Sequence, residues 1–254
     1  MNDNEIYRAC CNNDYTSLKN LLKKGGQNLL EQINDGNCNS LAVACRNTNI
    51  PIVKLLLKHG AKPGRYRIRN DYLYTSYNDG YLNNTDLLLN ACSVNNIPLI
   101  KLLVKYGAIN KHLDYRICID ILKCVYDQDN IYVFELLLQN GILNKSSIIH
   151  DFNSSFSYNN YNDSYCELLH KACYENNMIM IKLMIKYSIN ANYYKNDTSA
   201  ICIAIRSRNF ILLNLLLKNG AKVYTLDNHN NESILYKLSK QKDIGSLALV
   251  LEMF

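Results

Sequence analysis

One pattern of apolar, small and cap-forming residues recurs seven times along this 254-residue chain. Each copy ends at an anchor position, and the seven anchors are Gly25, Gly60, Gly107, Gly141, Ser188, Gly220 and Phe254. Nineteen and sixteen residues before an anchor lie an apolar residue and then usually alanine, and three more apolar residues lie seven, four and three before it. A tandem repeat of this kind means that one unit explains the whole fold.

The spacing within a unit predicts two short helices, because apolar residues three and four apart lie on one stripe of a helix. Eleven residues before each anchor stands an asparagine or aspartate, a side chain that accepts hydrogen bonds from the first N–H groups of a helix. These predicted N-caps are Asp14, Asn49, Asn96, Asn130, Asn177, Asn209 and Asp243. Several residues before the caps tolerate a left-handed backbone, and the anchor glycines end the second helices in the same way.

A unit of 32 to 35 residues with two helices and a connecting segment resembles the ankyrin repeat. Leu41–Ala44 and Ile52–Ala61 are similar to its two helices and glycine-alanine exit, and Leu169–Ala172 to part of its Thr-Pro-Leu-His-x-x-Ala region. No copy keeps the Thr-Pro pair. The resemblance covers residues 5–254 as about seven divergent repeats. It implies one domain over residues 1–254, an all-α helix-turn-helix repeat solenoid with hairpin or finger junctions.

Two junctions are about a dozen residues longer than the others, since the spacing between anchors is 35, 47, 34, 47, 32 and 34. The predicted fingers occupy about 65–84 and 148–165. Both are rich in Tyr, Asn, Ser and Asp, a composition close to that of antibody contact loops. Insertions in repeat proteins often lie on the binding face, so we interpret both fingers as surfaces that contact a partner. The alternative is that a chain with 20 tyrosines fills its loops with them and packs some rings back on the repeats.

The sequence predicts a non-catalytic scaffold that binds a macromolecular partner through the concave surface of its first helices and through the two fingers. A stack of repeats holds such a surface rigid, which lowers the ordering cost of binding. The alternative for each residue named in the next sentence is that its side chain only keeps the surface soluble or packs against its neighbours. The predicted partner-binding residues are Arg8, Arg46, Tyr66, Tyr72, Tyr74, Tyr77, Asp127, Phe152, Phe156, Tyr158, Tyr161, Tyr174 and Arg206.

An alternative partner is nucleic acid or another anionic molecule. Arg65, Arg67 and Arg69 alternate with apolar residues, and the formal net charge is +6. The remaining basic residues are spread over the predicted solvent faces of successive second helices, as in Lys54 and Lys58. No nucleic-acid-reading motif accompanies them, so a protein partner is favoured.

A metal-dependent or thiol enzyme is the remaining alternative, based on Cys166, His170 and Cys173 at helical spacing. Only three ligands are present and no matching pair follows, so we expect no metal and no cofactor. The five histidines lie in different repeats without a recurring nucleophile, and we expect no enzyme. Four of the ten cysteines share one repeat position, which predicts reduced, buried thiols: Cys10, Cys45, Cys92 and Cys173.

No stretch approaches the apolar length of a membrane span, and the residues after Met1 lack the pattern of a signal peptide. We therefore expect an intracellular, cytoplasmic monomer that does not insert in a membrane. The sequence leaves open the identity of the partner and whether the chain is part of a longer protein.

Overall fold

The computed structural model describes residues 5–25, 33–34, 40–63, 65–66, 85–110, 113–143, 163–187, 189, 191–192, 194–195, 198–221 and 244–251. The chain divides into two compact units, Met1–Lys145 (unit 1) and Ser146–Phe254 (unit 2). In both units the described residues form pairs of antiparallel helices, with two short pairs of strands between them. The predicted all-α repeat fold is confirmed.

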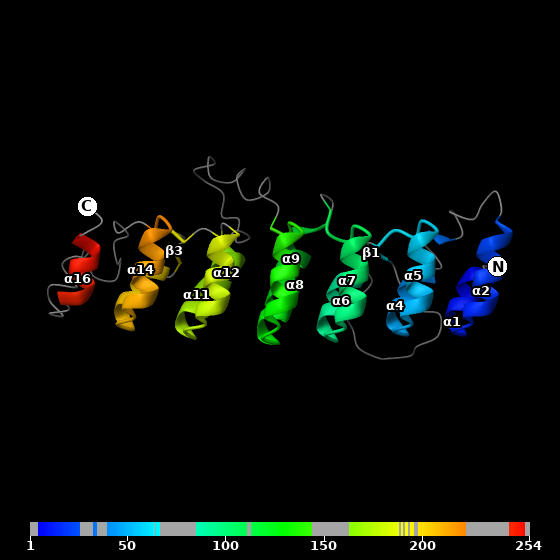
Figure 1. The fold of residues 1–254 in the computed structure, drawn as a ribbon, viewed down its shortest axis with the longest axis horizontal. Coiled ribbons are helices and arrows are strands. Elements are labelled where there is room, and N and C mark those ends of the chain that lie inside the picture. Colours follow the sequence, from blue (N-terminus) through cyan, green and yellow to red (C-terminus); the bar gives the residue numbers. More distant parts are fainter. Residues whose placement is uncertain are drawn as a thin grey trace, which may run out of the picture. The chain divides into compact units, whose positions relative to one another are not determined.

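The described residues of unit 1 form four helix pairs in chain order (Figure 1). The first helices contact one another along a row, as do the second helices along theirs. The first helices are α1 (Glu5–Cys11), α4 (Ser40–Arg46), α6 (Leu87–Ser93) and α8 (Tyr115–Asp127). The second helices are α2 (Tyr15–Lys24), α5 (Ile50–Lys58), α7 (Ile97–Lys105) and α9 (Ile131–Gln139).

Unit 2 follows the same scheme. Its first helices are α11 (Asp163–Tyr174) and α13 (Ala200–Arg206), and its second helices are α12 (Met178–Lys186) and α14 (Phe210–Lys218). Helix α16 (Ile244–Leu251) packs on α14 and corresponds to the second helix of the predicted seventh copy. Val250 in α16 is buried as predicted, whereas Leu251 is 55% exposed. Leu235 and Leu238, which stand nineteen and sixteen residues before Phe254 as the apolar pair of this copy's predicted first helix, lie outside the described residues.

Helix α5 shows why one of these segments folds as it does. The Asn49 side chain accepts a hydrogen bond from the backbone N–H of Ile52 at 3.2 Å, which satisfies a donor that the helix leaves free. Pro51 lies in the first turn, where a missing N–H costs nothing. Val53 and Leu56 are fully buried on one stripe, and Gly60 ends the segment with φ of 92°.

The predicted caps and left-handed turn positions are confirmed in six copies. Each predicted cap from Asp14 to Asn209 accepts a hydrogen bond from the N–H three residues later. Asp243 lies outside the described residues. The residue before each of the six caps has φ between 51° and 55°, and these are Asn13, Thr48, Asn95, Asp129, Asn176 and Arg208.

Asparagine side chains also join neighbouring repeats. The Asn130 amide donates from Nδ2 to the Oδ1 atom of Asn95 at 2.6 Å, and Asn209 bonds in the same way to Asn176 at 2.7 Å. At the other end of a helix pair, Asn34 donates to the carbonyl oxygen of Gly60 at 3.1 Å. Asn130 and Asn209, two of the asparagines that cap a second helix, therefore also bond to the preceding repeat.

The first long junction begins and ends in a short antiparallel pair of strands, β1 (Arg65–Tyr66) and β2 (Thr85–Asp86). Asp86 is buried and accepts hydrogen bonds from the N–H groups of Leu88 and Leu89 in the first turn of α6. In unit 2, β3 (Tyr194–Lys195) pairs with β4 (Thr198–Ser199), and buried Ser199 caps α13. No repeat of this chain has the Thr-Pro pair before its first helix. In two repeats, Asp86 and Ser199 cap the first helix instead.

Two first helices are longer than the repeat spacing predicts. Helix α8 begins at Tyr115, capped by Asp114, and places Ile117 and Ile121 in the core before the repeat position at Leu122. Helix α11 begins at Asp163. None of the helices in the described ranges is long and apolar enough to cross a membrane.

Candidate partner-binding surface

The last residue of each first helix is exposed, and its chemical type changes from one repeat to the next. These six residues are Cys11, Arg46, Ser93, Asp127, Tyr174 and Arg206. We call this set, which is defined by repeat position alone and has members in both units, the helix-end column. Four of them, Arg46, Asp127, Tyr174 and Arg206, are predicted partner-binding residues. The structure places each of them in solvent at the same position of its repeat.

The residues before the helix-end column form a constant buried frame. Ala44 and Ala172 are fully buried, which lets the neighbouring first helices approach closely. The cysteines predicted to share one repeat position, Cys10, Cys45, Cys92 and Cys173, are all buried and free. Burial raises the pKa of each of these four thiols from 9.0 to about 12, so they stay protonated at neutral pH. In each repeat, the exposed residue that varies therefore follows buried residues that vary little.

In unit 2 the column combines an aromatic ring, Tyr174, with one cation, Arg206. The Tyr174 side chain is 65% exposed at the end of α11, and Arg206 ends α13, which packs against α11. Beside Tyr174, the Lys171 ammonium lies 3.9 Å from a carboxylate oxygen of Glu175. Tyrosine and arginine are the residue types that most often anchor protein interfaces.

Arg8 lies in α1 three residues before the helix-end column and is exposed. The finger residues are placed less fully. Tyr66 lies in β1, at the point where the first finger leaves the helical repeats. The other finger residues lie outside the described residues: Tyr72, Tyr74, Tyr77, Phe152, Phe156, Tyr158 and Tyr161.

Some exposed apolar residues did not enter the sequence prediction. Val94 is 64% exposed directly after the helix-end column, although it reads as an apolar helix residue in the sequence. The first turns of second helices also expose Tyr132 and Ile211, at 52% and 73%. The available signal was the repeat register, because Pro51 and Pro98 occupy the same exposed position as these two residues.

Cys166, His170 and Cys173, on which the metal or thiol-enzyme alternative is based, do not form a metal or catalytic cluster among the side chains that the structure describes. His170 and Cys173 are buried on α11, and the side chain of Cys166 is outside what the structure describes. The high pKa of Cys173 keeps it a thiol, which is a poor nucleophile and a poor metal ligand. Among the described residues, no three His, Cys, Asp or Glu side chains lie close enough together to hold a metal ion. Arg65 lies in β1, while Arg67 and Arg69 fall outside the described ranges.

Comparison with known proteins agrees with this architecture. Residues 121–227 match a family model described as ankyrin repeats in three copies. No curated protein matches the chain at a significant level. Among solved structures, the chain is similar to the ankyrin repeat domain of Bcl-3, a member of the IkappaB protein family. The TM-score is 0.56 at 19% identity, with 96% of each chain covered.

Two further solved structures are more distant in shape. The human ASB11 ankyrin repeat domain gives a TM-score of 0.44 at 18% identity, covering 91% of this chain and 90% of that one. An ankyrin repeat domain from Acinetobacter baumannii AYE gives 0.33 at 17% identity, covering 98% and 97%. The sequence match and the helix-pair architecture together identify the repeats: residues 121–227 match ankyrin repeats, and the chain has the ankyrin repeat fold.

Proposed function

We propose that this chain is a non-catalytic protein-binding module whose partner contacts the helix-end column, Arg8 and the two fingers. Ankyrin repeat domains are in general protein–protein interaction modules. The observation that carries the proposal for this chain is the contrast within its own repeats. The buried frame stays nearly constant, while the exposed residue that it supports changes between arginine, serine, aspartate, tyrosine and cysteine.

The proposed mechanism is display of a preformed surface. Each column residue is attached to a helix that is packed against its neighbours in the unit, so its backbone loses little freedom when a partner binds. The first finger leaves the repeats through the β1–β2 pair, and buried Asp86 ties that pair to the start of α6. The two ends of the first finger are therefore joined to each other and to the start of a packed first helix.

The test is direct binding by variants of the full chain. The partner is first recovered by affinity capture from the native cell and is then purified. Shortening residues 70–80 and 152–160 to brief turns leaves the described helices intact, because loop length changes the closure cost only slightly. We expect this variant, and separately Tyr174→Ala with Arg206→Ala, to weaken partner binding at least about tenfold, as loss of interface anchors does.

The matched control is Lys182→Ala with Lys218→Ala, which removes two exposed side chains from the second helices of the same unit. The control should retain the affinity of the unchanged chain. Circular dichroism should show the same helix content in all variants. If the shortened fingers and the Tyr174 and Arg206 changes both leave the dissociation constant within twofold, the partner binds elsewhere and the proposal is wrong.

A further inference from the structure

Three of the four second helices described in unit 1 carry charge of a single sign. Helices α2, α5 and α7 together contain seven lysines and no aspartate, glutamate or arginine. A soluble surface normally mixes both signs, because like charges repel and destabilise the folded state. The fourth second helix, α9, breaks this series of lysine-only helices. Its Glu135 stands at the repeat position of Lys19, Lys54 and Lys101.

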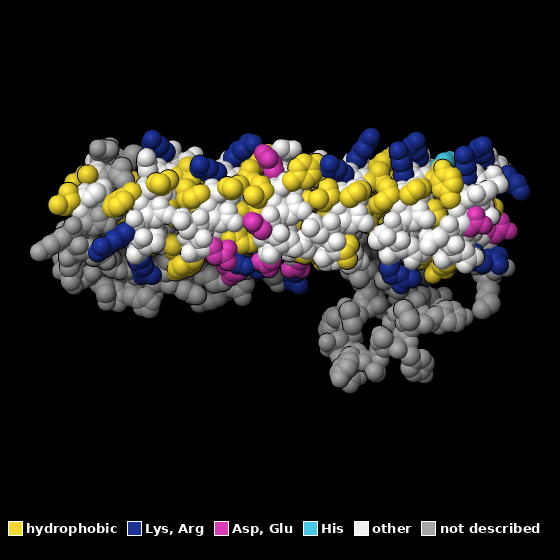
Figure 2. Space-filling view, turned by 60° about the horizontal axis from the view of Figure 1, so that its bottom comes forward, with side chains coloured by type: hydrophobic (Ala, Val, Ile, Leu, Met, Phe, Trp, Pro, Cys, Tyr) yellow, Lys and Arg dark blue, Asp and Glu magenta, His cyan; other side chains and the backbone are white. Residues whose placement is uncertain are grey.

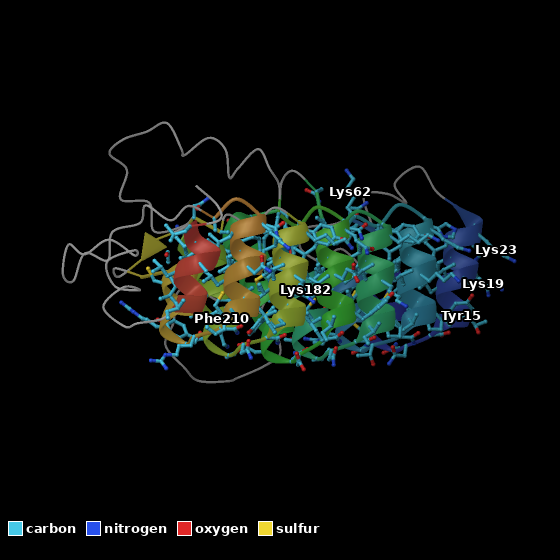
Figure 3. All side chains as sticks on the ribbon, turned by 60° about the vertical axis from the view of Figure 1, so that its left-hand side comes forward. Tyr15, Lys19, Lys23, Lys62, Lys182 and Phe210 are labelled. Carbon is cyan, nitrogen blue, oxygen red and sulfur yellow. The ribbon has the colours of Figure 1, made fainter. Side chains whose placement is uncertain are left out.

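Six of these lysines form a regular array. Each helix contributes two exposed lysines four residues apart, which places them on one stripe. The pairs are Lys19 with Lys23, Lys54 with Lys58, and Lys101 with Lys105. Figure 3 shows Tyr15, Lys19 and Lys23 along one side of α2, pointing away from it. Because α5 packs against both α2 and α7, the three pairs stand side by side.

Within the part of the chain that the structure describes, none of these six ammonium groups forms an ion pair with a carboxylate. Two of them lie over aromatic rings instead. The Nζ atom of Lys19 is 5.8 Å from the centre of the Tyr15 ring, and that of Lys101 is 4.7 Å from the Tyr132 ring of the next repeat. A ring attracts a cation without cancelling its charge, so both ammonium groups remain available to an anion.

An apolar band lies beside the array, at the first turns of the same helices. Tyr15 is 39% exposed, and Pro51 and Pro98 are exposed at the corresponding turns of α5 and α7. Ile50 and Ile97 are half-buried next to the prolines. Figure 2 shows hydrophobic side chains in a band next to a row of basic ones on this face. The surface therefore offers parallel rows of apolar and cationic groups.

We propose that the lysine array of α2, α5 and α7 binds an acidic amphipathic helix of a partner protein, lying across the three helices. Packed helices are about 8–10 Å apart, and seven residues of an α-helix rise about 10.5 Å. A partner helix with glutamate or aspartate at every seventh residue therefore brings one acidic turn to each lysine pair. Apolar residues three or four positions away then face the apolar band. The ammonium groups donate hydrogen bonds to the carboxylates.

Other anionic partners fit this surface less well. Nucleic-acid sites favour the planar fork of arginine for phosphate, and these three helices contain none. A lipid surface rewards large apolar side chains that project beyond the cations, whereas Ile50 and Ile97 here are half-buried. This face is separate from the helix-end column, so the inference does not depend on the function proposed above.

The experiment uses the full chain and a synthetic peptide of three heptads. Each heptad carries glutamates on one helical stripe and leucines on the adjacent stripe, and a scrambled peptide of the same composition is the control. Binding is measured by fluorescence anisotropy at several salt concentrations. We expect the patterned peptide to bind at least about tenfold more tightly than the scrambled one, and more weakly as salt rises.

Lys54→Glu with Lys101→Glu should weaken binding of the patterned peptide at least about tenfold, because two attractions become repulsions. Lys54→Arg with Lys101→Arg keeps the charge and should stay within about threefold. The control Lys182→Glu with Lys218→Glu lies in unit 2, where Asn214 interrupts the lysine pattern, and should not change binding. Circular dichroism confirms that each variant is folded.

Three results would overturn the proposal. The first is equal affinity for the patterned and scrambled peptides. The second is unchanged affinity after both charge reversals in α5 and α7. The third is charge-dependent binding of phosphatidylserine vesicles or of oligonucleotides by a chain that does not bind the patterned peptide, which would assign the array to lipid or nucleic acid.

Discussion

Replacing Phe134 with alanine should lower the free energy of unfolding of unit 1 by about 3–5 kcal/mol. Phe134 is fully buried in α9, and its ring packs edge-on against Tyr126 of α8, with ring centres 6.4 Å apart. Truncation loses the transfer free energy of the ring, its contact with Tyr126, and the packing around the cavity left behind. Urea unfolding followed by circular dichroism measures the change.

Two variants of the same helix serve as controls for Phe134→Ala. Phe134→Leu installs the residue that stands at this repeat position in Leu18 and Leu213, and should cost less than about 1.5 kcal/mol. Gln139→Ala changes an exposed side chain and should stay within about 0.5 kcal/mol. A loss below about 1 kcal/mol for Phe134→Ala would be close to the effect of an ordinary surface substitution, and it would show that α8 and α9 do not share this core.

Replacing Asn130 with alanine should cost about 2 kcal/mol, the second largest expected effect on stability. Its Oδ1 atom accepts the N–H of Val133 at 3.0 Å, and its Nδ2 atom donates to Asn95 of the preceding repeat at 2.6 Å. Alanine removes both the helix cap and the bond between repeats. The measurement is again the free energy of unfolding in urea.

Asn96→Ala provides the matched comparison for Asn130→Ala. Asn96 caps α7 through the N–H of Leu99 at 3.1 Å, but Thr48 stands where the preceding asparagine would be. Its loss should cost about 1 kcal/mol, the usual value of a cap alone. Asn95→Gly keeps the left-handed turn and removes only the acceptor of Asn130. Equal losses for Asn96→Ala and Asn130→Ala would mean that the bond between repeats contributes nothing.

Much of this fold can be predicted from the sequence because each repeat carries local signals that agree with its packing. The asparagine caps, the left-handed residue before them and the anchor glycines indicate where the second helix of a unit begins and ends, as in α5 and α7. The recurrence of Cys45 and Cys92 at one register position correctly indicated buried thiols. No single motif in this chain is specific, and the prediction depends on the same pattern recurring in seven repeats.

The remaining features depend on contacts that the register does not encode. The extension of α8 to Tyr115 follows from the cap at Asp114 and the burial of Ile117, which a fixed repeat length hides. The exposure of Val94 depends on where the turn after α6 places it. The interpretation of the fingers as contact surfaces rests on composition alone, and it stays a prediction.

Hydrogen–deuterium exchange of the chain, alone and with its captured partner, tests most directly whether the helix-end column and the fingers form the binding surface. We expect slower exchange in the complex at the ends of α4, α11 and α13 and in residues 65–84 and 148–165, with the second helices unchanged by this partner. Protection confined to α2, α5 and α7 would instead place the partner on the lysine array. That result, or protection at none of these segments, would contradict the proposed surface.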